Sequence, residues 1–600
     1  MEELTYPFDG EYLIKKKKSI KRALLEEDRP RISKKIAVLG GSTTRDVIQI
    51  LELFLLDMGI EPTFYESEYN QYYEDAVFGN ERLKEFFPDI IYIHTTSRNV
   101  PDVMFPNVTD TEEQAEEKLE QEYGHFREVW ERLAETYDCP VIQNNFEKPS
   151  YRLLGNMDAW DYRGREQFLS RLNQKFHQYA REHDKFYIQD IDWLAAEYGV
   201  SRWNDPVYWH MYKYSPAVGA IPELAFNLAN MIKAIYGKNK KALVLDLDNT
   251  LWGGIVGDDG PENIEIGQET GMAQIYSEFQ SYLKSLKEMG VLLNIDSKNE
   301  EENALAGLKR PDSVLKPEDF IAIRANWAPK DQNLNQIASL LNLGEDALVF
   351  VDDNPAERQK VKAGTAAAVP EMTRGHEAEP ERYIKILDRS GFFEPMGISG
   401  DDLNRSAMYQ ANEQRKKMEQ TFGDYQEYLR SLEMKGEIGP YAPEYMQRIA
   451  QLTNKSNQFN LTTMRCSQAD MERFAKEPRY VTLYGKLSDK FGDNGVVSVI
   501  LGEQEGPAIH LELWLMSCRV LKRDMEKAML DQLVKEAGKR GARTLIGYYY
   551  PTAKNKMVKE FYKEMGFGFA EELPEGGTVW KLDLETYIPQ NTVICVTERK

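Results

Sequence analysis

The sequence predicts an α/β protein with several domains. The chain has 600 residues, whereas a typical domain has roughly 100–200. Strand patterns alternate with helix patterns up to residue 395, which is typical of parallel α/β sheets. Beyond that point consecutive strand patterns indicate an α+β domain with an antiparallel meander. We therefore expect an N-terminal extension at 1–34, α/β domains at 35–237 and 238–395, and an α+β domain at 396–600.

The composition excludes several classes of function. The chain carries 75 Lys and Arg against 98 Asp and Glu, a formal charge of −23. This acidic balance argues against a nucleic-acid-binding protein and against binding to an anionic membrane surface. No apolar run approaches the ~18 residues of a membrane helix. The four cysteines are scattered and resemble no disulfide framework, so we expect a cytoplasmic protein; they are Cys139, Cys466, Cys518 and Cys595.

The first α/β domain starts with a buried strand from Lys34, a glycine-rich turn and a helix over 46–59. Another helix is predicted over 112–137. Further strands are predicted at 62–69, 89–95, 140–145 and 185–191.

The second α/β domain opens with the strand 242–245, directly followed by the polar run Asp-Leu-Asp-Asn-Thr. Ligands of open α/β sheets bind at such carboxyl ends of strands. Strands are also predicted at 290–296 and 346–353, with a helix over 273–290.

Two carboxylates of the polar run, Asp246 and Asp248, can face one site from an extended backbone. One can attack phosphorus, and the other can protonate the leaving oxygen and then deprotonate the incoming nucleophile. Asp352 and Asp353 end another buried strand and supply the hard oxygen ligands that Mg²⁺ prefers. Ser297 can donate to a phosphate oxygen. Lys330 can balance the negative charge of phosphate and carboxylates. A solvated turn or a helix cap is the alternative for an isolated pair of carboxylates.

The order of these motifs resembles the haloacid dehalogenase (HAD) superfamily. The resemblance implies that Asp246 is the nucleophile, Asp248 the general acid/base, and that Thr250, Ser297 and Lys330 bind phosphate. It implies a Mg²⁺ site formed by Asp246, the carbonyl of Asp248, Asp352 and Asp353.

The surrounding runs LDLDNTLWGG, DSKNEEE, WAPKDQNL and VFVDDNPAERQKV resemble the FkbH-like branch of that superfamily. The implied function is transfer of a glyceryl or related three-carbon acyl group from 1,3-bisphosphoglycerate to the phosphopantetheine thiol of an acyl carrier protein, in polyketide or related biosynthesis. The short spacing between the motifs leaves no room for a large cap domain, so we expect a site that is open to a large substrate or covered by a neighbouring domain.

Ser42, in the turn LGGS after the first strand, resembles the serine of SGNH-type hydrolases, whose fold is flavodoxin-like. Asp205 and His210 are the candidates for completing a triad. They lie five positions apart instead of the usual three, and Gly41 stands where an aspartate is usual. Asn99 or Asn145 is a candidate oxyanion donor. Both an active serine hydrolase and a degenerate scaffold remain open.

The last domain resembles the GNAT acyltransferase fold. Helices are predicted at 402–423, 444–454, 525–541 and 555–567, and strands at 480–489, 494–503, 508–517 and 544–551, with a turn at 492–495. In that fold two strands splay apart and the next helix receives a pyrophosphate at its N-terminus. Here Lys522 and Asp524 stand where glycines are expected, so a single phosphate on a carrier's pantetheine arm suits the site better than coenzyme A.

Candidate residues for binding the carrier or its pantetheine arm are Arg519, Lys522, Arg523, Asn454, Asn457 and Asn460. Cys518, beside Arg519 at a strand end, is the candidate for carrying the acyl group as a thioester; a buried core cysteine is the alternative.

Two other functions remain open for the whole chain. One is a HAD-family phosphatase without acyl transfer, and the other is a non-catalytic scaffold.

Overall fold

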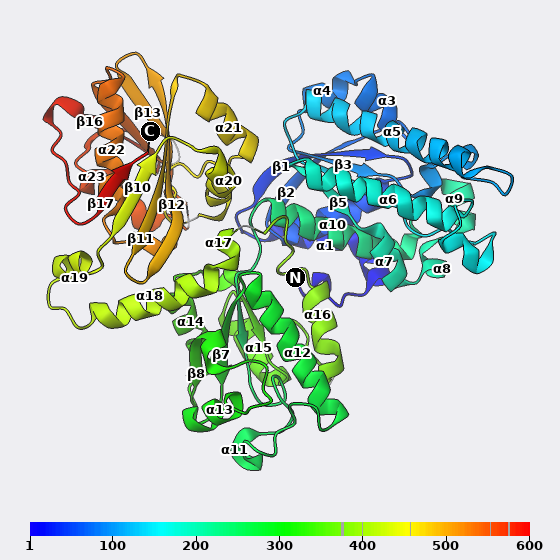
Figure 1. Ribbon diagram of the computed structural model, residues 1–600, viewed down its shortest axis with the longest axis horizontal. Coiled ribbons are helices and arrows are strands. Elements are labelled where there is room, and N and C mark those ends of the chain that lie inside the picture. Colours follow the sequence, from blue (N-terminus) through cyan, green and yellow to red (C-terminus); the bar gives the residue numbers. More distant parts are fainter. Residues whose placement is uncertain (374–376, 399, 457, 553, 574–575, 600) are drawn as a thin grey trace. The chain divides into compact units, whose positions relative to one another are not determined.

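The computed structural model describes the chain except residues 374–376, 399, 457, 553, 574–575 and 600 (Figure 1). The chain divides into two compact units. The first comprises residues 1–238 with 389–396, and the second comprises 239–388 with 397–600. Among the described residues, no helix is both long enough and apolar enough to cross a membrane.

The first unit is built on a five-stranded parallel sheet with the strand order β2-β1-β3-β4-β5. The five strands are β1 (Ile32–Gly40), β2 (Ile60–Glu66), β3 (Ile90–His94), β4 (Val141–Asn144) and β5 (Phe186–Gln189). The parallel α/β sheet predicted for this part of the chain is thereby confirmed.

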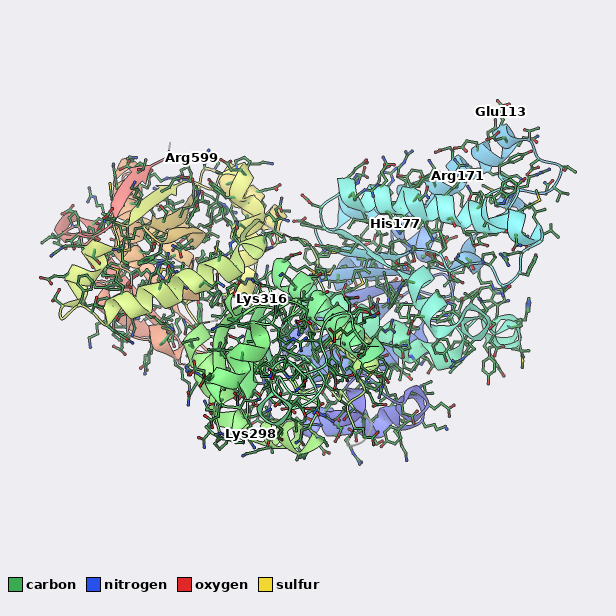
Figure 2. The ribbon with its side chains drawn as sticks, turned by 60° about the horizontal axis from the view of Figure 1, so that its bottom comes forward. Glu113, Arg171, His177, Lys298, Lys316 and Arg599 are labelled. Atoms are coloured by element: carbon green, nitrogen blue, oxygen red, sulfur yellow. The ribbon has the colours of Figure 1, made fainter. Side chains whose placement is uncertain are left out.

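Helices cover both faces of this sheet because alternate side chains of β1 point to opposite sides. Ile36 and Val38 share one core with α1 (Gly10–Glu26), α2 (Arg45–Asp57) and α10 (Ile221–Ile235). Leu39 faces the other core, which holds α5 (Glu112–Thr136) and α6 (Arg165–Glu182), the helix that carries Arg171 and His177 (Figure 2). The shorter helices are α3 (Tyr72–Val77), α4 (Glu81–Phe86), α7 (Ile191–Tyr198), α8 (Val200–Trp203) and α9 (Pro206–Tyr212).

The second unit begins with a four-stranded parallel sheet in the order β8-β7-β6-β9. Its strands are β6 (Ala242–Leu245), β7 (Leu292–Ser297), β8 (Phe320–Ala325) and β9 (Leu348–Val351). The strand β8 was not predicted from the sequence. The helices are α11 (Val256–Asp259), α12 (Gly271–Glu288), α13 (Glu301–Leu308), α14 (Lys330–Leu341), α15 (Pro355–Gly364) and α16 (Tyr383–Arg389).

The C-terminal part of this unit holds an eight-stranded mixed sheet in the order β15-β16-β14-β13-β12-β11-β10-β17. Its strands are β10 (Lys435–Gly439), β11 (Tyr480–Asp489), β12 (Gly492–Glu505), β13 (Ala508–Met516), β14 (Thr544–Tyr549), β15 (Gly568–Glu572), β16 (Thr578–Asp583) and β17 (Cys595–Glu598). Its helices are α17 (Gly400–Leu403), α18 (Arg405–Glu419), α19 (Tyr425–Ser431), α20 (Met446–Lys455), α21 (Gln468–Lys476), α22 (Met525–Lys539) and α23 (Phe561–Glu564). The predicted meander β11-β12-β13 is confirmed.

Two local predictions in this sheet need correction. The turn between β11 and β12 consists of Lys490 and Phe491, because Asp489 pairs with Gly492 and accepts a hydrogen bond from the amide of Phe491. The predicted turn at 492–495 therefore belongs to β12. The helix expected over 555–567 is a 3-10 turn at Lys556–Val558 followed by the single turn α23, since short helices often tighten at their ends.

Candidate active site

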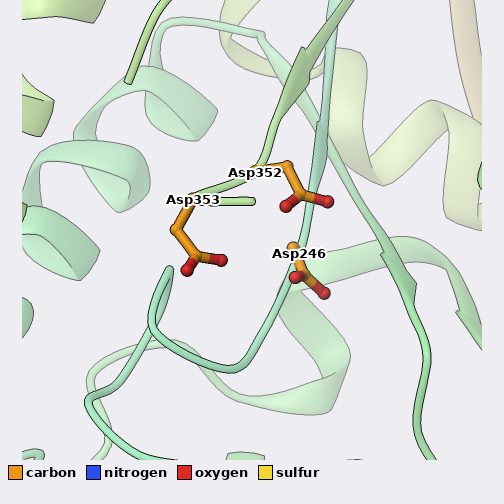
Figure 3. A group of neighbouring side chains, drawn as sticks. All are labelled: Asp246, Asp352 and Asp353. Carbon is orange, nitrogen blue, oxygen red and sulfur yellow. The ribbon is translucent and has the colours of Figure 1, made fainter. Parts of the chain in front are cut away.

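The carboxyl edge of the central sheet gathers three carboxylates. Asp246 is the first residue after β6, and Asp352 and Asp353 follow β9. β6 and β9 are parallel neighbours, so residues that follow both strands meet at the same edge. One ligand oxygen of each carboxylate lies within 4.8 Å of the others (Figure 3).

Lys330 neutralises part of the negative charge of these three carboxylates. It is the first residue of α14 and is 2% exposed. Its Nζ lies 2.5 Å from Oδ2 of Asp352 and 3.0 Å from Oδ2 of Asp246. Burial lowers the pKa of Lys330, but the two carboxylates outweigh burial and raise it above its ordinary value. The lysine therefore stays charged while it holds two of the three acidic groups together.

One ammonium group does not balance three carboxylates. Burial, reinforced by Asp246, raises the pKa of Asp352 to about 7 and that of Asp353 to about 6. The Oδ1 atom of Asp246 is buried and accepts no hydrogen bond from the described residues. The cluster is rich in carboxylate oxygens, and one lysine does not balance its negative charge. Such a cluster fits a hard divalent cation such as Mg²⁺. The predicted metal-binding carboxylates are thus brought together.

Asp248 lies beside this cluster in a separate hydrogen-bonding environment. Its Oδ1 accepts hydrogen bonds from the indole of Trp252 at 2.9 Å and the amide of Val256 at 3.0 Å. Its Oδ2 accepts one from the side-chain amide of Asn299 at 2.8 Å. Burial nevertheless raises the pKa of Asp248, against the effect of these donors. A carboxylate with a raised pKa, held in a fixed orientation, suits a general acid/base.

The predicted phosphate-binding hydroxyls have different surroundings. Ser297, the last residue of β7, is buried, and its Oγ accepts a hydrogen bond from Asn299 at 3.2 Å. Asn299 thus connects Ser297 with Asp248. The hydroxyl of Thr250 accepts a hydrogen bond from the amide of Asp353 at 3.2 Å, so it holds the two acidic loops together.

Several residues of the site were missed by the sequence reasoning. Asn249 takes the left-handed conformation (φ 54°) between Asp248 and Thr250, and its carbonyl accepts a hydrogen bond from the hydroxyl of Tyr383 at 2.9 Å. Asp296 is fully buried in β7, where burial raises its pKa to about 7 and Asn333 donates to its Oδ1. The donors Tyr383 and Asn333 lie in helices that are distant in the sequence from the residues they bind, so only the run DLDNT itself could have pointed to Asn249.

The three residues predicted as a possible SGNH site in the first unit have separate partners. The hydroxyl of Ser42 donates to the carbonyl of Ser215 at 3.3 Å, and the same carbonyl is 2.8 Å from Nε2 of His94. Asp205 caps α9 by accepting from the amides of Val207 and Tyr208. His210 is exposed on α9. Of the oxyanion candidates, Asn99 donates to the carbonyl of Gly41, and Asn145 donates to Asp190.

The structure does not place the predicted carrier-binding cations together on one surface. Arg523 is buried, 3.3 Å from Asp489, and it donates to Asn412 of α18. The guanidinium of Arg519 donates hydrogen bonds to the hydroxyl of Ser517 and to the sulfur of Met408. Lys522 is exposed.

Two of the asparagines predicted to bind the carrier or its pantetheine arm, Asn454 and Asn460, have structural roles. The side-chain amide of Asn454 donates to the carbonyls of Ala450 and Cys466, and the buried Asn460 accepts from the amide of Thr463. Asn457 and the side chain of Cys518 lie outside the described residues, so their predicted roles remain predictions.

Comparisons with known proteins bear on the first unit and on the site. Residues 35–233 match the family model described as FkbH, N-terminal domain. A solved structure, the N-terminal part of the protein BF1531 from Bacteroides fragilis, containing a phosphatase domain complexed with Mg, is 28% identical. The match covers 64% of this chain and 99% of that one, with a TM-score of 0.58. The multidomain α/β fold is thereby shown.

Two acetyltransferase structures also match about a quarter of the chain. The ribosomal-protein-S18-alanine N-acetyltransferase from Escherichia coli is 14% identical over 25% of this chain and 94% of its own, with a TM-score of 0.20. The GNAT domain of PAT from S. lividans is 17% identical over 24% and 89%, with a TM-score of 0.20. No curated protein matches the sequence significantly.

Proposed function

We propose that this chain is a Mg²⁺-dependent HAD-type enzyme that acts on an acyl phosphate. Its substrate is 1,3-bisphosphoglycerate or a related compound, and its acceptor is the phosphopantetheine thiol of an acyl carrier protein. The observation that supports this most is the convergence of Asp246, Asp352, Asp353 and Lys330 at one sheet edge, beside the fixed carboxyl of Asp248. The solved relative with a phosphatase domain bound Mg.

The residues of the site have complementary roles in this reaction. A bound Mg²⁺ would be held by Asp246, Asp352 and Asp353 and would supply positive charge to the phosphate. Lys330 adds a second positive charge, and Ser297 offers a hydroxyl for a phosphate oxygen. Asp248 takes the proton from the acceptor thiol as the thiol attacks the acyl carbon. The bond between that carbon and the bridging oxygen then breaks, and inorganic phosphate leaves with the bridging oxygen.

A phosphatase without acyl transfer is the second candidate, and it is supported by Oδ1 of Asp246, which has no hydrogen-bond partner in the described part of the chain. In that reaction this oxygen attacks phosphorus, and the bond between phosphorus and the bridging oxygen breaks. Asp248 protonates the departing carboxylate oxygen and then deprotonates the water that hydrolyses the aspartyl phosphate. The two reactions therefore leave the bridging oxygen in different products.

An isotope experiment separates them. An acyl phosphate labelled with ¹⁸O at the bridging oxygen is incubated with the enzyme, Mg²⁺ and an acyl carrier protein. Acyl transfer predicts labelled phosphate and a carrier whose intact mass increases by the acyl group. Labelled carboxylate with an unchanged carrier mass would establish the phosphatase instead.

A further inference from the structure

Two parallel strands of the C-terminal sheet separate along their length. β13 and β14 pair from Ala508 with Thr544 to Leu511 with Gly547. Beyond these residues β13 continues to Met516 and β14 to Tyr549 without pairing to each other. A gap between separating strands exposes backbone donors and acceptors, which an extended chain with amide groups, such as the pantetheine arm of coenzyme A, can bind.

The chain's own segment Phe459–Thr462 occupies this gap. On the β13 side, the amide of Leu461 donates to the carbonyl of Trp514 at 3.1 Å, and the amide of Met516 donates to the carbonyl of Phe459 at 3.0 Å. On the β14 side, the amide of Tyr550 donates to the carbonyl of Leu461 at 2.9 Å. The segment therefore acts as a short strand inserted between β13 and the end of β14.

Two side-chain hydrogen bonds also hold this segment in place. The hydroxyl of Thr462 donates to the carbonyl of Glu512 at 2.7 Å. The buried side-chain amide of Asn555 donates to the carbonyl of Asn460 at 3.0 Å. These contacts come from both sides of the gap and add to the three backbone hydrogen bonds.

The segment is also part of the hydrophobic core. Leu461 is 0% exposed, and Phe459 packs against Phe561 with ring centroids 4.9 Å apart. Withdrawal of the segment would expose both side chains to water and leave buried backbone groups of β13 without partners. The contacts are those of a permanent structural element.

The start of α22 is equally unsuited to a phosphate. Asp524 is its N-cap residue and is largely buried, with its carboxylate 3.0 Å from Lys527. Glu526 follows in the first turn, and burial raises its pKa. Carboxylates occupy the end of the helix that favours anions, and the neighbouring Arg523 is turned towards Asp489.

We infer that the C-terminal domain binds no coenzyme A-type arm between β13 and β14, because Phe459–Thr462 fills that gap as a built-in strand. The inference stands independently of the proposed function, since it concerns only the C-terminal sheet.

Two measurements on the full-length protein test it. Calorimetric titration with coenzyme A should give no saturable heat. Hydrogen exchange should show the amides of Leu461 and Met516 protected to within about tenfold of those in the centre of β13, with no change on adding coenzyme A. Saturable binding, or exchange at 459–462 that slows when coenzyme A is added, would overturn the inference.

A pair of variants distinguishes a fixed strand from a removable gate. Leu461→Ala loosens the segment, whereas Thr462→Val removes one side-chain hydrogen bond and serves as the mild control. Both should remain unable to bind coenzyme A, and hydrogen exchange at 459–462 should be faster in Leu461→Ala. Coenzyme A binding gained by Leu461→Ala would show that the segment is a gate and would contradict the inference. If Leu461→Ala does not fold, the wild-type measurements decide.

Discussion

The ammonium of Lys330 lies 2.5 Å from Oδ2 of Asp352. The pair is buried. The same ammonium also contacts Asp246, which follows the neighbouring strand β6. Lys330 therefore stabilises an acidic cluster that would otherwise hold two buried carboxylates and a half-buried one, Asp353, without a counter-charge.

Removing that charge should destabilise the protein. Lys330→Met should lower the free energy of unfolding by about 3–5 kcal/mol, the usual cost of leaving a buried charge unpartnered. Mg²⁺ should restore more stability to the variant than to the wild type, because the cation supplies the missing charge. Denaturant unfolding with EDTA or with Mg²⁺ measures both effects, and Lys309→Met is an exposed-lysine control. Equal stability of variant and wild type in EDTA would refute this role.

Asp248 should act in proton transfer. Asp248→Asn should slow turnover by on the order of 10²–10⁴, the usual contribution of a general acid/base, because the amide cannot take up or release the proton. Steady-state assays of phosphate release measure this, with the exposed Asp258→Asn on α11 as the control. A loss of less than about threefold would remove Asp248 from the chemistry.

Ser42 should not take part in acyl transfer. Its hydroxyl donates to the carbonyl of Ser215, and His210 is exposed on α9. Ser42→Ala should therefore leave both phosphate release and carrier acylation close to wild type. Loss of acylation in a folded Ser42→Ala protein would show that the first unit is catalytic.

Glu122 should make the stability of the first unit depend on pH. It is buried in α5, and burial raises its pKa from 4.5 to about 7. The folded state binds the proton of Glu122 more tightly than the unfolded state does. The stabilisation from the protonated carboxyl is therefore full below pH 4.5 and is lost as the pH rises towards 7. Glu122→Gln should raise the melting temperature at pH 8 and change it little at pH 4.5. The exposed Glu117→Gln is the control on the same helix, and an equal effect of Glu122→Gln at both pH values would contradict the prediction.

The sequence could predict the acidic cluster because the geometry of a parallel sheet brings strand ends together. Asp246 follows one apolar run and Asp352 follows another, and these two runs are neighbouring strands. Asn299 was missed because its bonds to Asp248 and Ser297 depend on the path of a loop. Strand β8 was missed because its burial is only partial.

Arg523 illustrates what sequence reasoning cannot resolve. Beside Lys522 it looks like part of a basic surface patch, but it reaches Asp489 and Asn412, which lie 34 and 111 positions away. The segment Phe459–Thr462 is similar, since the sequence pointed only to Asn460 within it, as a candidate for binding the carrier or its pantetheine arm. Its insertion beside β13 depends on contacts between distant parts of the chain.

In the proposed reaction, Asp246 and a divalent cation are both required for the release of phosphate from the acyl phosphate. The most direct measurement is the rate of phosphate release from 1,3-bisphosphoglycerate, in the presence of the acyl carrier protein, by wild type and Asp246→Asn, each with Mg²⁺ and with EDTA. We expect release by the wild type only when Mg²⁺ is present, and none by a folded Asp246→Asn protein under either condition, because an amide neither provides an anionic metal ligand nor attacks phosphorus. Undiminished release by Asp246→Asn, or by the wild type after exhaustive chelation, would contradict it.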